Sequence, residues 1–409
     1  MLIAGEASGD LLASELVTAL RAATPDAKFF GAGGSRMSAA GVDLVYEMSN
    51  LSVVGITDVL AKLFELRRLM KTLLAAAVER RPDVIIGVDY GGFNLRFGHA
   101  VKTFVRSHPQ LEWNPRIVQF VSPQVWASRP GRADRLAADY DLLLSIFPFE
   151  KAWYARRTPR LRVEFVGHPM VGRIAGGGEF ANHKAPSAGA STADRPPQIV
   201  LLPGSRRSEL KRHLPPMLEA LKTIQEQLPL AKAKMVLPGD DLAGIVFREL
   251  ARRLDGRVEV AGPPSLADAQ ALAQKCFPNL ELQTGNLWQA LARADLAISK
   301  TGTVTMECAF FGVPAVTFYK GSWLNYQIAR HLITVKTFTM PNLLADEEVY
   351  PELLQNALTG ENLAAAALDL LGNEERRRKI KTQLAAVIAS LGGPGAPQRA
   401  ARAILALLS

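Results

Sequence analysis

Short apolar runs alternate with longer segments of helical periodicity along most of the chain, and few folds are compatible with this alternation. A helix between two strands returns the chain to the same edge of a sheet, so the strands pair in parallel. Helical periodicity is clearest at 11–23, 97–107 and 287–294. The sequence therefore predicts an α/β protein built on parallel sheets, with strands at LIAG, DVIIGVD, RIVQFVS, DLLLSIF, IVLLPG, KMVLPG, VEVAG, LELQTG, LAISKTG and AVTFY.

A chain of 409 residues is too long for one ordinary hydrophobic core and fits two domains. The alternation of strands and helices breaks at 172–198, which is rich in Gly, Ala, Ser and Pro and has no hydrophobic periodicity. Such a composition is typical of a linker or mobile loop. We therefore expect one parallel-sheet domain at 1–171, a second at 199–360, and terminal helices at 361–409, where Ala and Leu are frequent.

The formal net charge of +9, from 48 Lys and Arg against 39 Asp and Glu, favours phosphate-rich partners such as nucleotides, nucleic acid or an anionic membrane. No basic patch is interleaved with stacking aromatic residues, so we do not expect nucleic-acid binding. Cys276 and Cys308 lack the spacing of metal ligands. The first residues lack the features of a signal peptide, and no apolar run reaches about eighteen residues, so we expect a cytoplasmic protein.

Ligands of open parallel sheets bind beside the carboxyl ends of the strands, so the loops that follow strands hold the candidate site residues. In the first such loop, GEASGD, two glycines let the backbone approach a ligand and Glu6 is a candidate catalytic residue. Ser8 and Asp10 are candidates for substrate binding, or else they cap the following helix. A tight turn is the alternative explanation of the glycines, and the spacing is not the GxGxxG of a dinucleotide-binding loop.

The second loop, GVDYGGFN, places Asp89 at the end of an apolar strand. Apolar surroundings raise the pKa of a carboxyl group toward the working range of a general base, so Asp89 is the candidate base, with an N-cap or Asx turn as the alternative. Asn94 of this loop, and Ser122 and Gln124 of the third loop, SPQVW, are candidates for substrate binding. Trp126 of the third loop offers a stacking face for a sugar or packs in the core.

The fourth loop, LPGSR, begins the second predicted domain. Gly204 exposes backbone N–H groups, Ser205 adds a hydroxyl group and Arg206 provides a planar fork that suits two phosphate oxygens. A plain turn with a surface arginine is the alternative. We expect these three residues to bind the phosphates of a nucleotide.

The fifth loop, SKTGTVTMEC, follows a strand and opens a helix. Thr301, Gly302 and Thr303 place backbone N–H groups and the positive end of the helix toward an anion. Glu307, about one turn further along, is a candidate acceptor of hydrogen bonds from ribose hydroxyls. Alternatively, the threonines cap the helix and Glu307 is a favourable acidic residue in its first turn.

Two further segments are candidates for contact with substrate or membrane. Asn342, in the segment MPNLLA, is either a substrate-binding residue or a turn residue. The segment 58–81 is basic and amphipathic, and its apolar face either packs on a sheet or contacts a membrane surface. That face contains Leu63, Leu66, Leu69, Met70, Leu73, Leu74 and Ala77.

Eight sequence blocks together match the pattern of one known family. The chain resembles the lipid A disaccharide synthase family over nearly its whole length, in the blocks AGEASGD, GVDYGGFN, VSPQVWA, FPFEKAWY, GHPM, LLPGSRRSEL, SKTGTVTMEC and MPNLLA. The resemblance implies two Rossmann-like parallel-sheet domains facing a cleft (GT-B type), with C-terminal helices. It places the acceptor mainly on the first domain and the nucleotide-sugar donor on the second.

The reaction implied by the resemblance is an inverting glycosyl transfer. UDP-2,3-diacylglucosamine would be joined to 2,3-diacylglucosamine 1-phosphate by a β-1,6 linkage, with release of UDP and without metal or cofactor. Acylated substrates imply contact with the inner-membrane surface, and a homodimer is compatible with the pattern. The alternatives are another UDP-N-acetylglucosamine transferase or epimerase of the same fold, or a non-catalytic protein that binds lipid or nucleotide.

The resemblance also implies roles for individual residues of the matching blocks. It implies that Asp89 is the catalytic base and that Glu6 is the acidic residue of the first loop. It further implies that Arg206 and Glu307 bind the nucleotide and that Asn342 is the asparagine of the late motif. These roles agree with the chemistry that the loops themselves suggest.

Overall fold

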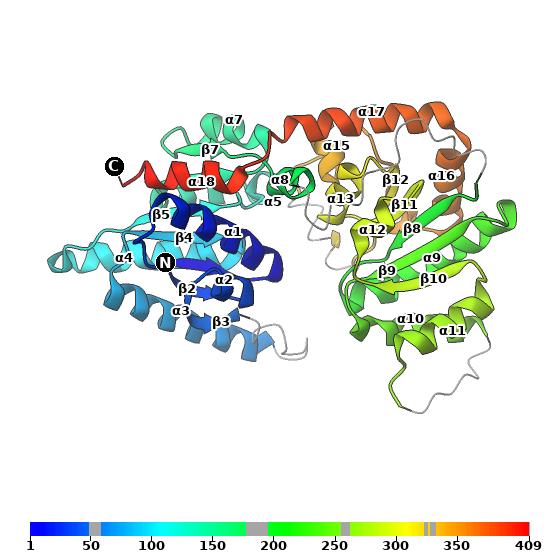
Figure 1. The fold of residues 1–409 in the computed structure, drawn as a ribbon, viewed down its shortest axis with the longest axis horizontal. Coiled ribbons are helices and arrows are strands. Elements are labelled where there is room, and N and C mark those ends of the chain that lie inside the picture. The colour runs from blue at the N-terminus through cyan, green and yellow to red at the C-terminus, as the bar shows by residue number, and fades with distance from the viewer. Residues whose placement is uncertain (49–58, 177–194, 255–261, 323–325, 328–332, 409) are drawn as a thin grey trace. The chain divides into compact units, whose positions relative to one another are not determined.

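The computed structural model describes residues 1–48, 59–176, 195–254, 262–322, 326–327 and 333–408. The chain divides into two compact units (Figure 1). Unit 1 comprises Met1–Gly176 together with Leu391–Ser409, and unit 2 comprises Gly177–Ser390. Each unit contains one sheet with helices on both of its faces, so the chain has the α/β architecture that its sequence predicts.

The sheet of unit 1 has seven strands in the order β3-β2-β1-β4-β5-β6-β7, and each pairing that the structure describes is parallel. The apolar strand β4, with the sequence VIIGV, is entirely buried, as expected for a strand covered on both faces. Chain order reverses between β1 and β4, where open α/β sheets bind ligands. The strands are β1 (Leu2–Ala4), β2 (Phe30–Gly33), β3 (Asp43–Glu47), β4 (Val84–Val88), β5 (Arg116–Phe120), β6 (Leu142–Ser145) and β7 (Val163–Phe165).

Helices of unit 1 come from both ends of the chain. The last helix, α18, lies against α1 although the two are far apart in sequence (Figure 1). The helices are α1 (Ala7–Ala23), α2 (Ser35–Ala39), α3 (Val59–Arg80), α4 (Gly91–Ser107), α5 (Val125–Ser128), α6 (Arg132–Asp139), α7 (Pro148–Arg157), α8 (Pro169–Ala175) and α18 (Ala396–Leu405).

The sheet of unit 2 repeats this arrangement with six strands in the order β10-β9-β8-β11-β12-β13, again with parallel pairings wherever they are described. Its reversal of chain order lies between β8 and β11. The strands are β8 (Gln198–Leu202), β9 (Lys232–Leu237), β10 (Leu280–Thr284), β11 (Leu296–Lys300), β12 (Ala315–Tyr319) and β13 (Glu352–Leu354).

Helices cover the sheet of unit 2 in packed pairs. Helix α9 packs against α16, and α10 packs against α11 (Figure 1). The helices are α9 (Arg207–Gln227), α10 (Ala243–Arg253), α11 (Leu266–Cys276), α12 (Leu287–Leu291), α13 (Val304–Phe310), α15 (Met340–Ala345), α16 (Gly360–Gly372) and α17 (Glu374–Ser390).

The predicted strands other than VEVAG are strands of the two sheets, while nearly all of VEVAG lies outside the described residues. Short strands are absent from the prediction because their apolar runs are brief: β2 is half glycine, and β3, β7 and β13 each carry acidic residues. Most of the predicted linker 172–198 also lies outside the described residues; its ends belong to α8 and β8. The terminal helices are divided between the units, with α16 and α17 in unit 2 and α18 in unit 1.

Candidate active site

Glu6 and Asp89 lie in neighbouring loops at the point where the sheet of unit 1 reverses its chain order. Glu6 follows β1, Asp89 follows β4, and these two strands are paired in register. A Cβ atom placed on Gly9 would lie 3.7 Å from the Cβ atom of Asp89, so the start of α1 is close to the Asp89 turn. The Tyr90 ring lies over Gly5, where an added Cβ atom would be 2.2 Å from the ring. Gly5 therefore lets the two loops meet.

The Asp89 turn has an unusual backbone conformation that several hydrogen bonds hold in place. Asp89 and Tyr90 have φ angles of 50° and 45°, in the left-handed region that non-glycine residues rarely adopt. The Asp89 amide donates to the Phe120 carbonyl at 2.8 Å. The Asp89 carbonyl accepts hydrogen bonds from Asn94 Nδ2 at 2.8 Å and from Gln119 Nε2 at 2.9 Å. Strain held in this way is typical of functional sites.

The surroundings of Asp89 raise the pKa of its carboxyl group above the usual range. Burial raises the pKa of the Asp89 carboxyl group, and the nearby Glu6 carboxylate raises it further, while a hydrogen bond from the Tyr90 amide opposes both effects. The side chain of Asp89 is half-buried, whereas that of Glu6 is exposed. The geometry therefore combines a partly desolvated carboxyl group with a second, solvated one.

The structure places Asn94 beneath the Asp89 turn and not at a ligand-accessible surface. Its side chain is only 2% exposed and it donates to the Asp89 carbonyl. Gln119, which the sequence did not single out, is also buried and shares this role. Gln119 lies in the middle of an apolar strand, RIVQF, and a buried amide in such a strand is the signal that could have identified it.

Asp10 likewise serves the framework. It is 7% exposed, and its carboxylate accepts hydrogen bonds from the amides of Gly34, Arg36 and Met37 at the start of α2. Asp10 thus caps α2, and the expectation that Asp10 or Ser8 would cap α1 is wrong, because no side chain caps the first turn of α1. Ser8 itself is exposed.

The SPQVW loop packs directly against the Asp89 turn. An added Cβ atom on Gly91 would lie 2.8 Å from Pro123. Gln124 is exposed, but Ser122 is 4% exposed and its hydroxyl group lies 3.2 Å from that of Tyr154. Of the two substrate-binding candidates in this loop, Gln124 alone is accessible.

Trp126 belongs to the core and is held by Glu150 of α7. Its indole N–H donates to Glu150 Oε1 at 2.9 Å, and its ring meets that of Phe149 edge to face. Glu150 is fully buried, and its Oε2 atom has no hydrogen-bond partner among the described residues. Burial raises the pKa of Glu150 to about 7, although hydrogen bonds from Trp126 and Ser122 oppose the increase. Glu150 is therefore a titratable group beneath the loop that the sequence did not indicate.

In unit 2, the loop with Gly204, Ser205 and Arg206 follows β8 at the second reversal of chain order. Gly204 has a φ angle of 125°, and an added Cβ atom would lie 2.6 Å from Glu209 Oε2. Glu209 Oε2 accepts hydrogen bonds from the amides of Ser205 at 3.1 Å and Arg206 at 3.4 Å. The expectation that the Ser205 amide is available to a phosphate is thus wrong for this structure, because Glu209 occupies it.

Lys300 joins the two nucleotide-site loops of unit 2, although the sequence suggested no role for it. Its Nζ atom lies 3.3 Å from Glu209 Oε1 and 3.4 Å from the position of a Cβ atom on Gly302. Burial raises the pKa of Glu209, but Lys300 and the Ser205 and Arg206 amides outweigh burial and hold it below the usual range. The side chain of Lys300 is 21% exposed, so its charge faces the loops.

Arg206 and the TGT turn complete this group. Arg206 is exposed and forms no ion pair in the described part of the chain. Thr301 is buried and its amide donates to the Phe318 carbonyl, whereas Gly302 and Thr303 are exposed. The accessible groups of this region are therefore Ser205, Arg206, Lys300 and the tip of the TGT turn.

Glu307 lies in the first turn of α13 and accepts a hydrogen bond from the Trp288 indole at 3.2 Å. Glu307 is half-buried. Trp288, from α12, is a neighbour that only the folded structure identifies. An acidic side chain beside an aromatic ring is an arrangement that suits a nucleoside.

Asn342 is completely buried, and its amide group is used within the protein. Its Oδ1 atom accepts from the amides of Val349 and Tyr350, and its Nδ2 atom donates to the Tyr350 carbonyl and to Glu352. This geometry gives Asn342 a framework role. Its assignment as a substrate ligand stays a prediction that the structure does not support.

Helix α3 covers most of the amphipathic segment 58–81. The side chains of residues 58–63, which include Leu63, lie outside the described part of the structure. Leu69, Leu73 and Ala77 pack in the core of unit 1, so the apolar face contacts the sheet layer. The side chain of Phe64, on the same helix, is 76% exposed, whereas Leu69, Leu73 and Ala77 of the apolar face are buried. In the part of the chain that the structure describes, no helix is long and apolar enough to cross a membrane, and no three metal-ligating side chains gather.

Comparison with known proteins relates this geometry to one enzyme family. The family model for lipid-A-disaccharide synthetase matches residues 1–255 and 257–406. The chain is 37% identical over 412 residues to the lipid-A-disaccharide synthase of Solibacter usitatus, with 99% of this chain and 96% of the relative covered. It is 34% identical over 416 residues to the enzyme of the same name from Myxococcus xanthus, with 100% and 97% covered.

Solved structures of low sequence identity share the fold. The UDP complex of MnaA from S. aureus has a TM-score of 0.60 at 10% identity, covering 100% of this chain and 95% of that one. The UDP-GlcNAc 2-epimerase from Neisseria meningitidis has a TM-score of 0.54 at 10% identity, with 100% and 98% covered. At such identities the likeness establishes the two Rossmann-like units of the GT-B architecture.

Proposed function

The chain belongs to the lipid-A-disaccharide synthetase family, and on that premise we propose that it transfers acylated glucosamine from UDP to an acylated glucosamine 1-phosphate with inversion. It is a glycosyltransferase of lipid A biosynthesis. The environment of Asp89 is the observation that supports the catalytic assignment. Asp89 carries a half-buried carboxyl group with a raised pKa, held on a strained turn where the sheet of unit 1 reverses its order.

In the proposed reaction, Asp89 accepts the proton of the acceptor 6-hydroxyl group. The hydroxyl oxygen then forms a bond to the anomeric carbon of the donor while the bond between that carbon and the UDP oxygen breaks. The electron pair of the broken bond leaves with UDP, and one displacement from the opposite face inverts the anomeric centre. The raised pKa makes Asp89 a stronger base than an ordinary aspartate, which suits it to accept this proton.

Donor binding is proposed for the loops of unit 2. Arg206 and Lys300 provide positive charge for the diphosphate, and the tip of the TGT turn adds backbone N–H groups. Glu307, beside Trp288, is proposed to accept hydrogen bonds from the ribose. Charge on the departing UDP is then stabilised by fixed positive groups of the protein.

Acylated substrates also lead us to propose contact with the inner face of the inner membrane. Phe64 is exposed on α3, and Arg67, Arg68 and Lys71 of the same helix are exposed as well. An apolar side chain among basic residues suits an anionic lipid surface. A homodimer remains a prediction from the sequence.

The test is UDP release from the donor, with and without acceptor, by the native chain and by Asp89→Asn and Asp89→Ala. We expect acceptor-dependent release to fall at least about a hundredfold in both variants, because general-base catalysis contributes on that order. Donor affinity should be unchanged, since Asp89 belongs to unit 1. Asp83→Asn is the matched control, because Asp83 is an exposed acid at the other end of the same strand region.

Retention of native activity in Asp89→Asn would show that Asp89 is not the catalytic base. Turnover of unacylated UDP-N-acetylglucosamine by the native chain, with no transfer from the acylated donor, would instead assign it to the related transferases or epimerases.

A further inference from the structure

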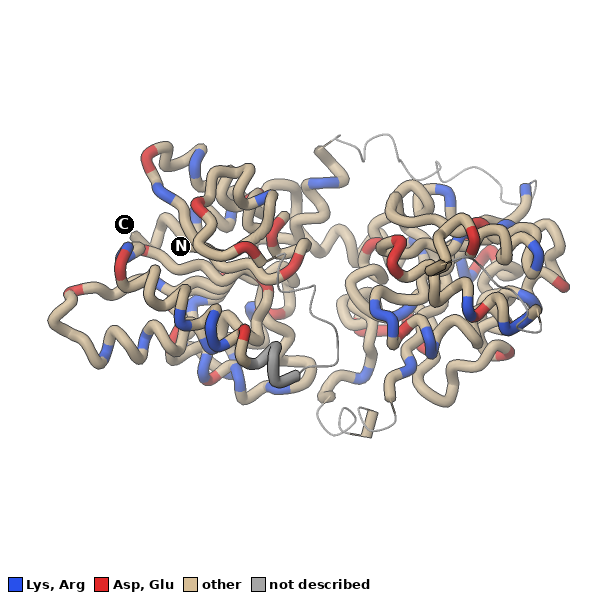
Figure 2. The backbone as a smooth tube through the Cα atoms, turned by 90° about the horizontal axis from the view of Figure 1, so that it is seen from below, with Lys and Arg blue, Asp and Glu red and all other residues tan. Residues whose placement is uncertain are grey.

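Four arginines of unit 1 gather where α4 packs against α6. Lysine and arginine residues occur over both units (Figure 2), so net charge alone does not identify a site. Arg96 lies on α4, Arg129 follows α5, and Arg132 and Arg135 lie on α6. Helices α4 and α6 are joined by a hydrogen bond from the Tyr140 hydroxyl to the Asn94 carbonyl and by the His99–Asp139 pair. We call these four residues the arginine cluster.

The positive charge of the arginine cluster is not neutralised within the described part of the protein. None of its four guanidinium groups forms an ion pair there. The two acidic residues of α6 are engaged elsewhere, Asp134 with Arg157 at 3.5 Å and Asp139 with His99 at 2.9 Å. The cluster is therefore a concentration of like charge that no described acidic side chain pairs with.

Crowding of the guanidinium groups has an electrostatic effect. Partial burial lowers the pKa of Arg132, and the charges of Arg129, Arg96 and Arg135 lower it further. Arg132 is also the first residue of α6, where the helix dipole already disfavours a cation. An anion bound here would relieve both sources of repulsion.

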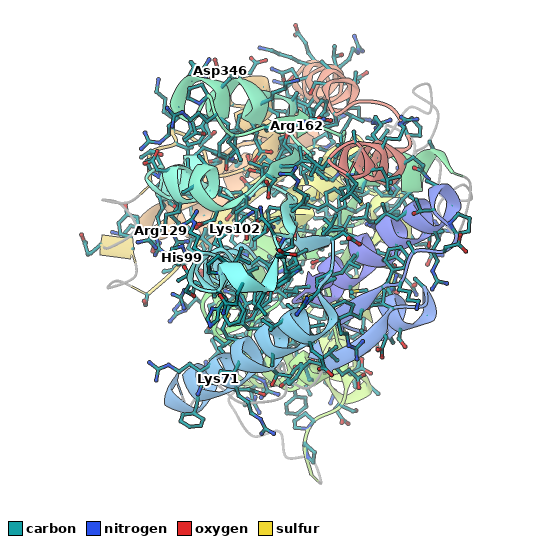
Figure 3. The ribbon with its side chains drawn as sticks, turned by 90° about the vertical axis from the view of Figure 1, so that its left-hand side faces the viewer. Lys71, His99, Lys102, Arg129, Arg162 and Asp346 are labelled. Carbon is teal, nitrogen blue, oxygen red and sulfur yellow. The ribbon has the colours of Figure 1, made fainter. Side chains whose placement is uncertain are left out.

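The arginine cluster borders the loops that carry the candidate catalytic residues. Helix α4 begins at Gly91, directly after Asp89 and Tyr90, and Arg96 lies about 7.5 Å further along the helix axis at 1.5 Å per residue. Arg129 closes α5, which follows the SPQVW loop. Figure 3 labels Arg129 and His99 among the side chains of this view. The cluster is thus near the proposed acceptor site and contains exposed side chains.

We propose that the arginine cluster binds the phosphate group of the acceptor sugar, which rests on the proposed function. The planar guanidinium fork matches two phosphate oxygens, and several such groups around one dianion give the affinity and the orientation that a single lysine would not. Binding the phosphate at this place orients the acceptor hydroxyl group toward Asp89. Phospholipid headgroups share the same chemistry, so the experiment must separate the two sources.

The experiment compares the native chain with Arg129→Gln/Arg132→Gln. Two acceptors are used in detergent micelles, 2,3-diacylglucosamine 1-phosphate and the same sugar without its phosphate. We expect the KM for the phosphorylated acceptor to rise at least tenfold in the variant, with the donor KM unchanged. With the dephosphorylated acceptor, the variant and the native chain should have equal KM values. Arg156→Gln/Arg160→Gln is the control, since it removes the same charge from exposed residues at the end of α7.

Equal losses with the two acceptors, or an unchanged KM for the phosphorylated one, would overturn the proposal. A variant that loses only sedimentation with phosphatidylglycerol vesicles, with its KM intact, would assign the cluster to lipid headgroups and also overturn it. Calorimetric binding of short-chain diacylglucosamine 1-phosphate gives a readout without turnover. Loss of this binding in the variant supports phosphate binding by the arginine cluster, whether or not the native chain transfers to either acceptor. Failure of the native chain to transfer to either acceptor would count against the proposed function instead.

Discussion

At the scale of single residues, the Asp89 turn stores strain that the surrounding side chains must offset. Each left-handed non-glycine residue costs about 1–2 kcal/mol, and Asp89 and Tyr90 are consecutive. Asn94 and Gln119 both donate to the Asp89 carbonyl and so hold the turn in this conformation. The carboxyl group of Asp89 is thereby kept near that of Glu6, whose charge raises the pKa of Asp89.

Removal of the Glu6 charge should shift the acidic limb of the pH profile. As the pH falls through the raised pKa of Asp89, the base becomes protonated and kcat/KM falls. In Glu6→Gln the like charge is absent, so the pKa of Asp89 decreases and the limb moves to lower pH. The shift is partial, because burial is the larger cause of the raised pKa. The measurement is kcat/KM from pH 4 to 8, with Glu79→Gln as the control for an exposed glutamate.

Glu150 should make the stability of unit 1 dependent on pH. Its pKa is about 7 in the fold against an ordinary 4.5, so the folded chain holds this proton more tightly than the unfolded chain. The tighter proton binding adds about 3 kcal/mol to the free energy of unfolding. This contribution is fully present below pH 4.5 and is lost as the pH rises to 7. Glu150→Gln, which stays neutral, should lack this loss. Parallel thermal melts at pH 5 and pH 8 test the difference, and equal pH dependence of the two proteins would exclude a buried neutral carboxyl group.

At the scale of elements, the turn from β8 to α9 connects backbone geometry to nucleotide binding. Glu209, in the first turn of α9, accepts hydrogen bonds from the amides of Ser205 and Arg206 and pairs with Lys300 from β11. The carboxylate thus ties the two strands on either side of the reversal point to one helix. Gly204 makes this contact possible because it has no side chain.

Gly204→Ala should weaken nucleotide binding. The φ angle of 125° is strained for alanine. The added methyl group would also lie 2.6 Å from Glu209 Oε2, so the Glu209 carboxylate would have to move. A cost of about 1–3 kcal/mol is expected, so the Kd for UDP should rise roughly fivefold to a hundredfold. Gly372→Ala is the control, since Gly372 is exposed, has open space around it and ends α16. Unchanged UDP affinity of Gly204→Ala by calorimetry would show that the turn tolerates a side chain.

At the scale of the whole molecule, the chain returns to its first unit at the end. Helix α18 packs against α1, and the Arg399 side chain donates to the carbonyls of Val166, Gly393 and Pro394. The His168 amide donates to the Leu391 carbonyl at 2.9 Å. Unit 1 is therefore complete only when the last nineteen residues, Leu391–Ser409, are present.

Deletion of residues 391–409 should destabilise unit 1 and leave unit 2 intact. The deletion exposes the surface of α1 that α18 covers and leaves the Val166 carbonyl without Arg399. In scanning calorimetry we expect one transition to move to lower temperature by several degrees and the other to stay in place. Deletion of 406–409, which retains α18, is the control. A single unchanged profile would show that α18 contributes little to unit 1.

The sequence by itself determined the parallel-sheet architecture and the loops that carry the candidate site residues. Strand and helix periodicity are local properties, and ligands of parallel sheets lie at the carboxyl ends of strands, so Glu6, Asp89 and Arg206 could be proposed as site residues from the sequence alone. The order of the blocks also identified the family.

Only the tertiary structure decided which polar residues face a ligand and which support the framework. A short polar side chain at a strand end can bind substrate or satisfy a buried backbone group, and its neighbours decide between these roles. Asp10, Asn94 and Asn342 serve buried backbone amides or carbonyls. The roles proposed for Lys300 and the arginine cluster depend on sheet order and on helix packing, which bring together residues that are distant in the sequence. A local sequence pattern does not contain this information.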